Sequence, residues 1–135
     1  MIFVDTSAFV AFFLNNEKHH EKVDLLFRKF MDSGFITNHD IVNETLNWFS
    51  KKTNPNLTLK IAKNLLGMET IGILETSMEE RLTALNFIDK FKDHKLSYTD
   101  AISFATINKL GIKKVFSIDS DFNLLKNVEN IFYSA

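Results

Sequence analysis

The sequence predicts a single α/β domain, residues 1–135, with a parallel sheet and helices on both faces. Short apolar runs of strand length alternate along the chain with longer segments whose apolar residues recur at helical spacing. This alternation is typical of βαβ units, in which a helix carries the chain back to begin the next parallel strand. The chain shows no repeat, low-complexity tract or linker, and 135 residues are enough to bury one core.

Helix breakers and caps set the element boundaries in the first half of the chain. Asn15-Asn16 and Ser33-Gly34 end helices, and either Asn38 or Asp40 can cap the helix that follows. Pro55, the only proline, suits the first position of another helix. The expected elements are a strand at 1–5, helices at 6–14 and 17–31, a strand at 35–37, and helices at 40–52 and 55–66.

The second half follows the same scheme. Gly67 and Gly111 end helices, and Ser77 and Ser97 open them. The expected elements are a strand at 71–74, helices at 77–91 and 97–110, a strand at 115–118, a short helix near 121–126 and a final strand at 131–133.

Composition narrows the class of protein. The chain is 45% hydrophobic and 24% charged, as in an ordinary globular domain, and its net charge is -1. Any contact with nucleic acid must therefore be local or pass through bound metal. The absence of cysteine excludes disulfides and thiolate zinc sites. No apolar stretch approaches the ~20 residues of a membrane span, and the chain begins without a signal-like segment, so a cytoplasmic protein without membrane contact is expected.

Fourteen phenylalanines are an unusual number for this length. Phe9, Phe12 and Phe13 share one short helix with other apolar residues, so that helix is apolar nearly all round. Such a helix is either buried in the fold or covered by a partner. Both possibilities stay open from the sequence. Trp48 and the phenylalanine stripes are expected in the core rather than as platforms for base stacking.

Four acidic residues occupy positions where an α/β chain can build a metal site. Two of them close buried strands, and the other two lie in the first turns of helices. A carboxylate at the end of a buried strand is costly to desolvate unless it is paired or bound to metal. Mg²⁺ and Mn²⁺ favour such all-oxygen sites. The residues, hereafter the four acids, are Asp5, Glu44, Asp100 and Asp119.

Topology predicts that the four acids meet. Ligands bind open parallel sheets at the carboxyl ends of the strands, where Asp5 and Asp119 lie. A helix that follows a strand begins at that edge of the sheet, which places Glu44 there. A helix that precedes a parallel strand runs antiparallel to it, so its amino end also lies at that edge, which places Asp100 there. Without a cation, the clustered carboxylates would raise one another's pKa values.

Each acid also has an ordinary structural interpretation. Ser97-x-x-Asp100 resembles a capping box, and Asp119 could form an Asx turn. Asp5 could simply cap the next helix, and Glu44 could be a solvated acid in a first turn. The metal interpretation rests on all four together.

The ordered set of motifs resembles the PIN-domain ribonucleases, most closely the small toxins of VapBC-type toxin–antitoxin pairs. The similarity spans essentially the whole chain. The motifs are MIFVDTSAF at 1–9, DIVNETL at 40–46, LSYTDAI at 96–102 with Ala105 after it, and VFSIDSDF at 115–122.

The resemblance implies a five-stranded sheet of order 3-2-1-4-5 and a ribonuclease that uses Mg²⁺ or Mn²⁺. The four acids would be the catalytic and metal-binding residues, and Asp121 is a spare acid that competes with Asp119 for the metal. Ser7 and Ser117 could hydrogen-bond an acid or a water. The implied partners are an RNA substrate, a small antitoxin and a second copy of the chain. Substrate phosphates could meet the lysines Lys51, Lys52 and Lys95.

Three alternatives remain at this stage. The chain could be a housekeeping RNA-processing nuclease of the same family, or a PIN-like scaffold that binds RNA or protein without turnover. A third possibility is a phosphatase, because Asp119-Ser120-Asp121 is similar to the Asp-x-Asp motif of haloacid-dehalogenase-like enzymes, although that motif normally follows the first strand.

Overall fold

The computed structural model describes residues 1–134 and contains a five-stranded sheet in the order β3-β2-β1-β4-β5. Every neighbouring pair of strands is parallel. The predicted parallel sheet and its order are therefore confirmed. Strand order reverses between β1 and β4, the place where open sheets bind ligands. The strands are β1 (Ile2–Val4), β2 (Phe35–Asn38), β3 (Ile71–Leu74), β4 (Lys114–Phe116) and β5 (Glu129–Asn130).

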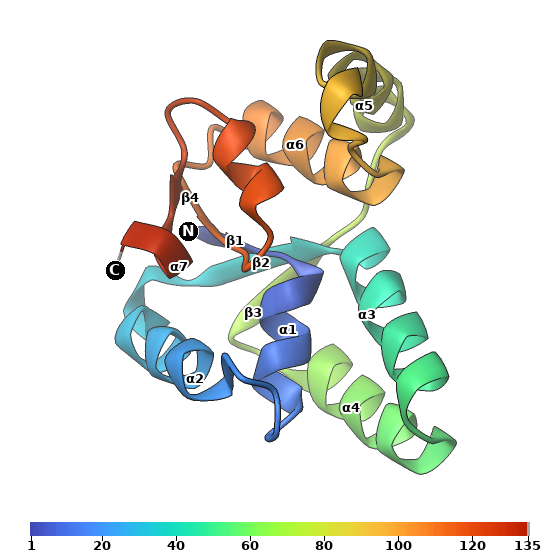
Figure 1. The fold of residues 1–135 in the computed structure, drawn as a ribbon, viewed down its shortest axis with the longest axis vertical. Helices are drawn as coiled ribbons and strands as arrows, with labels where there is room; N and C mark the ends of the chain where they lie inside the picture. The colour runs from blue at the N-terminus through green and yellow to red at the C-terminus, as the bar shows by residue number, and fades with distance from the viewer. Residues whose placement is uncertain (135) are drawn as a thin grey trace.

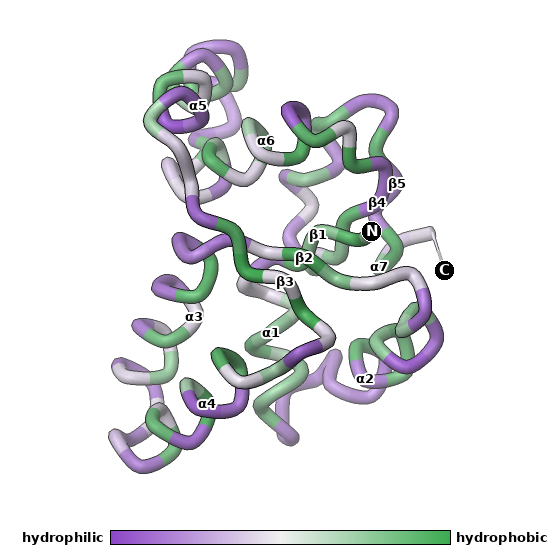
Figure 2. The backbone as a smooth tube through the Cα atoms, turned by 180° about the vertical axis from the view of Figure 1, so that it is seen from behind, coloured by the Kyte–Doolittle hydropathy of each residue, from purple (hydrophilic) through white to green (hydrophobic). Residues whose placement is uncertain are grey.

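Helices cover both faces of the sheet, as expected. In Figure 1, α5 and α6 lie above the sheet, whereas α1, α2 and α4 lie below it. The tube view from behind shows the same two layers, with hydrophobic residues following the central strands (Figure 2). The helices are α1 (Thr6–Phe13), α2 (His20–Lys29), α3 (His39–Lys52), α4 (Pro55–Gly67), α5 (Met78–Lys90), α6 (Tyr98–Leu110) and α7 (Ile131–Ser134).

Side-chain caps explain why most helices begin where the sequence predicts. Asn38, rather than Asp40, caps α3 by accepting a 2.8 Å hydrogen bond from the backbone N–H of Ile41. Asn54 caps α4 with Pro55 at its first position. Ser77 opens α5 with a complete capping box. Each cap satisfies a backbone N–H that a helix start would otherwise leave unpaired.

Two predicted boundaries shift because side chains bond to the backbone locally. α2 begins at His20 rather than at residue 17, because the Glu17 carboxylate accepts from the backbone N–H of His19 at 2.7 Å and holds a turn. The predicted helix at 121–126 is a 3₁₀ helix over Ser120–Leu124, and Asp119 caps it.

The prediction of a final strand at 131–133 is wrong. β5 comprises Glu129–Asn130, and residues 131–134 form the single turn α7. Asn130 ends the strand because its Oδ1 accepts from the backbone N–H of Phe132 at 3.2 Å. The apolar run that suggested a strand instead buries Ile131 and Phe132 from a helical turn. A run this short does not distinguish a strand from a buried helical turn.

The core is aromatic on both faces of the sheet. Phe27 of α2 packs against Phe12, Phe35 and Phe116, and Phe104 of α6 packs against Phe122 and two rings on the other side. These contacts account for much of the unusual phenylalanine content. Within residues 1–134, no helix is both long enough and apolar enough to cross a lipid bilayer.

Candidate metal centre

The four acids lie together. Their side chains line one pocket of about 450 Å³. The sequence predicted this meeting from topology alone, and the structure places all four there. Asp5 directly follows β1, Glu44 lies in the second turn of α3, and Asp100 is the third residue of α6.

Asp119 reaches the pocket from a different position than expected. The strand predicted at 115–118 is β4 and ends at Phe116, so Asp119 does not close a strand. The pairing of β4 with β1 ends before Ser117, because the Ser117 side chain hydrogen-bonds within the turn that follows. Its hydroxyl accepts from the backbone N–H of Asp119 at 3.0 Å. The resulting turn, rather than strand geometry, positions Asp119.

Asp5 is the most deeply placed of the four acids, with 3% of its surface exposed. Its Oδ2 accepts hydrogen bonds from Ser117 at 2.8 Å and from Ser7 at 3.1 Å. These are the two serines expected to support an acid. Burial, with a smaller contribution from the charge of Glu44, raises the pKa of Asp5 to about 6. The hydrogen bonds from the two serines and the nearby backbone N–H of Thr6 oppose that rise.

The other oxygen of Asp5 is buried and has no hydrogen-bond partner within residues 1–134. A buried carboxylate oxygen without a partner destabilises a fold by roughly 1–3 kcal/mol or more. Because the neighbouring side chains are also carboxylates, a bound cation is the group that would relieve this cost. Asp5 therefore fits a role as a metal ligand and does not fit the alternative role of a plain helix cap, since its side chain makes no capping bond to α1.

Asp100 has the most perturbed carboxyl group in the pocket. Burial first, and then the charges of Asp5, Asp119 and Glu44, raise the pKa of Asp100 to about 8, against a hydrogen bond with Ser97. Ser97 also caps α6 by accepting from the backbone N–H of Asp100 at 3.1 Å. The capping interpretation is thus partly realised, yet the carboxyl group faces the other acids.

Glu44 is held by a contact that the sequence did not reveal. Thr6 Oγ1 donates to Glu44 Oε1 at 2.5 Å, which joins the first turn of α1 to α3. Glu17 also lines the pocket. The motif at residues 1–9 includes Thr6 without indicating its partner, and no motif includes Glu17. Thr6 reaches Glu44 because α1 packs on α3, and Glu17 reaches the pocket from the turn between α1 and α2.

Asp121 belongs to the acid cluster as well. One carboxylate oxygen each from Asp100, Asp119 and Asp121 lie within 4.8 Å of one another, a spacing compatible with a shared divalent cation. Asp119 Oδ1 also accepts from the backbone N–H of Asp121 at 2.9 Å, which confirms the Asx-turn interpretation. This bond uses one oxygen of Asp119 and does not prevent the other from binding a cation. Burial and the charge of Asp119 raise the pKa of Asp121, and His94 opposes this. Asp119 and Asp121 are therefore not alternatives, because both belong to the same cluster of acids.

Asn130 supports the site from behind and was missed by sequence reasoning. Its Oδ1 accepts from the backbone N–H of Ser117 at 3.3 Å, and its Nδ2 donates to the Ser117 carbonyl at 3.0 Å. This amide holds in place the residue that bonds to Asp5. Only pairing between β4 and β5 brings Asn130 there.

Trp48 and the three lysines differ in how they relate to the pocket. Trp48 was expected in the core but is only half-buried and lines the acid pocket. Lys51 is exposed and lines an adjacent hollow. Lys52 and Lys95 are exposed and line neither.

The fold and the acid pocket together define an α/β domain with a carboxylate-rich site at the switch point of a parallel sheet. The family profile described as PIN domain matches residues 2–128. The chain belongs to the PIN domain family.

Known relatives share this fold over their whole length. The chain is 26% identical over 132 residues to the 23S rRNA-specific endonuclease VapC20 of Mycobacterium tuberculosis, covering 96% of this chain and 97% of that protein. The crystal structure of VapC20, described as a Sarcin-Ricin loop cleaving toxin, superposes with a TM-score of 0.82 at 21% identity, covering 96% of this chain and 98% of that one.

A second solved structure is more distant in sequence. VapBC2 from Rickettsia felis, bound to a DNA fragment from their promoter, superposes with a TM-score of 0.73 at 10% identity. It covers 96% of this chain and 97% of that one. A toxin-antitoxin complex from Klebsiella pneumoniae superposes with a TM-score of 0.66 at 14% identity, covering 95% of each chain.

Proposed function

We propose that this protein is a metal-dependent ribonuclease that hydrolyses RNA phosphodiester bonds, with the four acids as its catalytic and metal-binding residues. The observation that carries the proposal is the buried, unpartnered Oδ1 of Asp5 in a pocket shared with three other carboxylates. Similarity to VapC20, named a 23S rRNA-specific endonuclease, supports RNA as the substrate class. A cytoplasmic location is part of this proposal, because the protein would meet an RNA substrate there.

Oxygen donors alone line the acidic part of the pocket, which suits Mg²⁺ or Mn²⁺. Asp5, Asp100 and Asp119 would hold the cation, with Asp121 beside them. When bound, such a cation makes water a better nucleophile at neutral pH and offsets the charge that develops on the phosphodiester. Glu44, whose Oε1 accepts a hydrogen bond from Thr6, would help to bind the cation or orient the attacking water. Ser7 and Ser117 orient Asp5 through its Oδ2.

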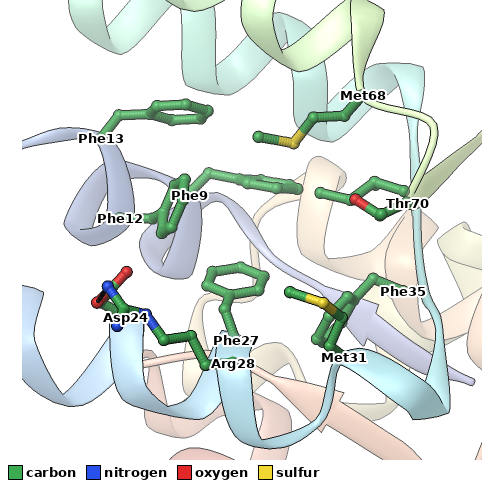
Figure 3. Close-up of a pocket in the computed structure, with 11 residues that line it drawn as sticks. Phe9, Phe12, Phe13, Asp24, Phe27, Arg28, Met31, Phe35, Met68 and Thr70 are labelled. Atoms are coloured by element: carbon green, nitrogen blue, oxygen red, sulfur yellow. Dashed lines mark ion pairs between the residues drawn. The ribbon is translucent and has the colours of Figure 1, made fainter.

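An apolar hollow on the other side of α1 supports the assignment as a toxin with an antitoxin partner. It measures about 270 Å³. Figure 3 shows the rings of Phe9, Phe12 and Phe27 around this hollow, with Asp24 and Arg28 at its edge. α1 is therefore not simply buried. We assign the hollow to apolar side chains of the antitoxin, in line with the structural similarity to a toxin-antitoxin complex.

A stripe on α5 supports a homodimer. Met78, Leu82 and Leu85 recur at helical spacing and are exposed. A monomer leaves such a stripe in water, whereas a second copy of the chain would cover it.

RNA cleavage tests the proposed function. Unstructured and ribosomal RNA are incubated with the protein and Mg²⁺, Mn²⁺ or EDTA, and Asp5→Asn is compared with Asp32→Asn, which changes an exposed acid outside the pocket. Cleavage should need the cation and fall at least 100-fold in Asp5→Asn but not in Asp32→Asn. If Asp5→Asn cuts as fast as the parent, the mechanism is wrong. RNA binding without cleavage under every condition would favour the scaffold alternative.

A further inference from the structure

A second hollow borders the acid pocket. It measures about 510 Å³ and is open to solvent. Thr6, Glu44 and Trp48 line both hollows, so the two lie side by side. The full lining of the second hollow is Thr6, Asp40, Asn43, Glu44, Asn47, Trp48, Lys51 and Thr99. The four acids explain the first hollow, and nothing in the nuclease mechanism explains the second.

One face of α3 supplies a polar row along this second hollow. Asn43, Asn47 and Lys51 are spaced four residues apart, so they lie above one another on the same side of the helix. All three are exposed. Within residues 1–134, their side chains take part in none of the hydrogen bonds or ion pairs that stabilise the fold. The row therefore offers two amides and one ammonium group to a ligand.

Trp48 stands where the two hollows meet. Its ring packs edge-to-face on Phe49, with 5.0 Å between ring centroids and 77° between ring planes. Phe49 is fully buried, so the core side of the indole is anchored. The rest of the half-buried ring lines both hollows. A large aromatic ring held at the border of two solvent-open hollows is suited to stacking on another flat ring.

We infer that Trp48 stacks on a base of single-stranded RNA, next to the phosphodiester bond that the four acids address. In this arrangement the adjoining nucleotides run along α3, where Asn43 and Asn47 hydrogen-bond to them and Lys51 meets a phosphate. The inference rests on the proposed nuclease function and adds to it a base contact made by Trp48. Stacking tolerates any base, because every base has a π-face.

The charge of the chain strengthens this inference. Its net charge is -1, and the acid pocket itself repels phosphates. Long-range attraction therefore contributes little to RNA binding, so uncharged contacts must carry more of it. A stacked base and amide hydrogen bonds are such contacts, and single-stranded RNA exposes the base faces that they need.

The test uses the fluorescence of Trp48, which is the only tryptophan of the chain. Cleavage-deficient Asp5→Asn protein with Mn²⁺ is titrated with an unstructured RNA oligonucleotide and, separately, with an abasic oligonucleotide of equal length. We expect saturable quenching by the RNA and none by the abasic chain. Equal quenching by both would overturn the inference, since phosphate contact would then suffice.

Binding of labelled RNA gives a second measurement. In the Asp5→Asn background, Trp48→Ala should weaken binding about tenfold, whereas Trp48→Phe should restore most of it. Asn47→Ala should weaken binding about threefold, and Asn86→Ala, which changes an exposed amide on α5, should not. Loss of the dimer in Trp48→Ala would overturn the inference by making Trp48 a contact between copies.

The outcomes separate this inference from the nuclease itself. Cleavage by the wild type without quenching in Asp5→Asn overturns the stacking role and leaves the nuclease intact. Base-dependent quenching without any cleavage by the wild type supports the stacking role and overturns the nuclease. If the protein neither binds nor cleaves RNA, both are overturned.

Discussion

The hydroxyl of Ser117 donates to Oδ2 of Asp5 at 2.8 Å and so joins the exit of β4 to the exit of β1. The same hydroxyl oxygen accepts from the backbone N–H of Asp119 at 3.0 Å. One side chain thus sets the position of two acids from opposite ends of the sequence. Ser117 is fully buried, so no water can take over this role without a rearrangement of the turn.

Replacement of Ser117 by alanine should weaken the metal site without dismantling the fold. Asp5 loses its shortest hydrogen bond, and Asp119 loses the acceptor for its N–H. We expect about tenfold weaker Mn²⁺ binding by calorimetry, a similar loss of kcat/KM for RNA cleavage, and about 1–2 kcal/mol less stability. Ser50→Ala, an exposed serine of α3, is the control. Unchanged Mn²⁺ affinity in Ser117→Ala would contradict the positioning role.

The metal-free protein should lose stability as pH rises. Burial raises the pKa of Asp5 to about 6, and that of Asp100 to about 8, above their ordinary values. Below about pH 4 both groups are protonated in the folded and unfolded states. Between that pH and the folded pKa values, the folded state binds more protons than the unfolded state, so the free energy of unfolding falls with increasing pH. The contribution of Asp5 alone is on the order of 3 kcal/mol.

Thermal unfolding in EDTA at about pH 5.5 and about pH 8.5 measures this effect. The Tm should be lower at the higher pH, and Mn²⁺ should raise it most there, because the cation binds the ionised carboxylates. Asp5→Asn should show a smaller fall, since its amide does not ionise. A metal-free Tm that rises between these pH values would contradict the raised pKa values.

Asp119 should contribute more to metal binding than Asp121. Asp119 lines the acid pocket and raises the pKa of Asp100. Asp121 does not line the pocket, although one of its carboxylate oxygens lies within 4.8 Å of oxygens of Asp100 and Asp119. Asp119→Asn should reduce Mn²⁺ affinity at least tenfold, and Asp121→Asn less than that. Calorimetry on both variants decides the order. The reverse order would make Asp121 the principal ligand.

The sequence predicted the parts of the fold that depend on local signals. Asn38, Ser77 and Ser97 begin helices because they cap them, and the alternation of elements predicted the sheet. The resemblance supplied the strand order. The pocket of the four acids was predictable because it follows from topology, which places strand ends and helix starts at one edge.

Contacts between distant side chains could not be predicted from the sequence. Asn130 reaches Ser117 only through pairing of β4 with β5, and Thr6 reaches Glu44 only once α1 packs on α3. The short helix α7 was mistaken for a strand because three apolar residues carry no period. Trp48 was expected in the core, although its position beside Glu44 on α3 places it at the site.

Glu80 should matter for stability and not for the metal. It is buried on α5, accepts from Thr106 Oγ1 of α6 at 2.6 Å and completes the capping box with Ser77. Glu80→Ala should lower the free energy of unfolding by about 1–3 kcal/mol in urea denaturation, because Thr106 is left without its partner. Glu79→Ala, the exposed neighbour, should have little effect. Mn²⁺ affinity should stay unchanged in both, and a selective loss in Glu80→Ala would show that α5 shapes the pocket.

The proposed dimer can be tested on α5. Leu82 is 58% exposed in the apolar stripe, and Leu59 of α4 is similarly exposed at 55% outside it. Leu82→Glu should give a monomer by light scattering, because a buried charge without a partner disfavours the interface. Leu59→Glu should leave the oligomeric state as it is. Dimerisation of Leu82→Glu at wild-type strength would exclude this surface as the interface.

The bond between Asn130 and Ser117 has a consequence for synthesis of the chain. A ribosome makes Asp5 well before Asn130, because the two residues lie 125 positions apart in the sequence. Until Asn130 emerges and β5 pairs with β4, the turn that joins Ser117 to Asp5 lacks the two hydrogen bonds that Asn130 makes to the Ser117 backbone. A growing chain therefore carries all four acids before this support is in place, so the proposed metal site is complete only once translation has passed Asn130.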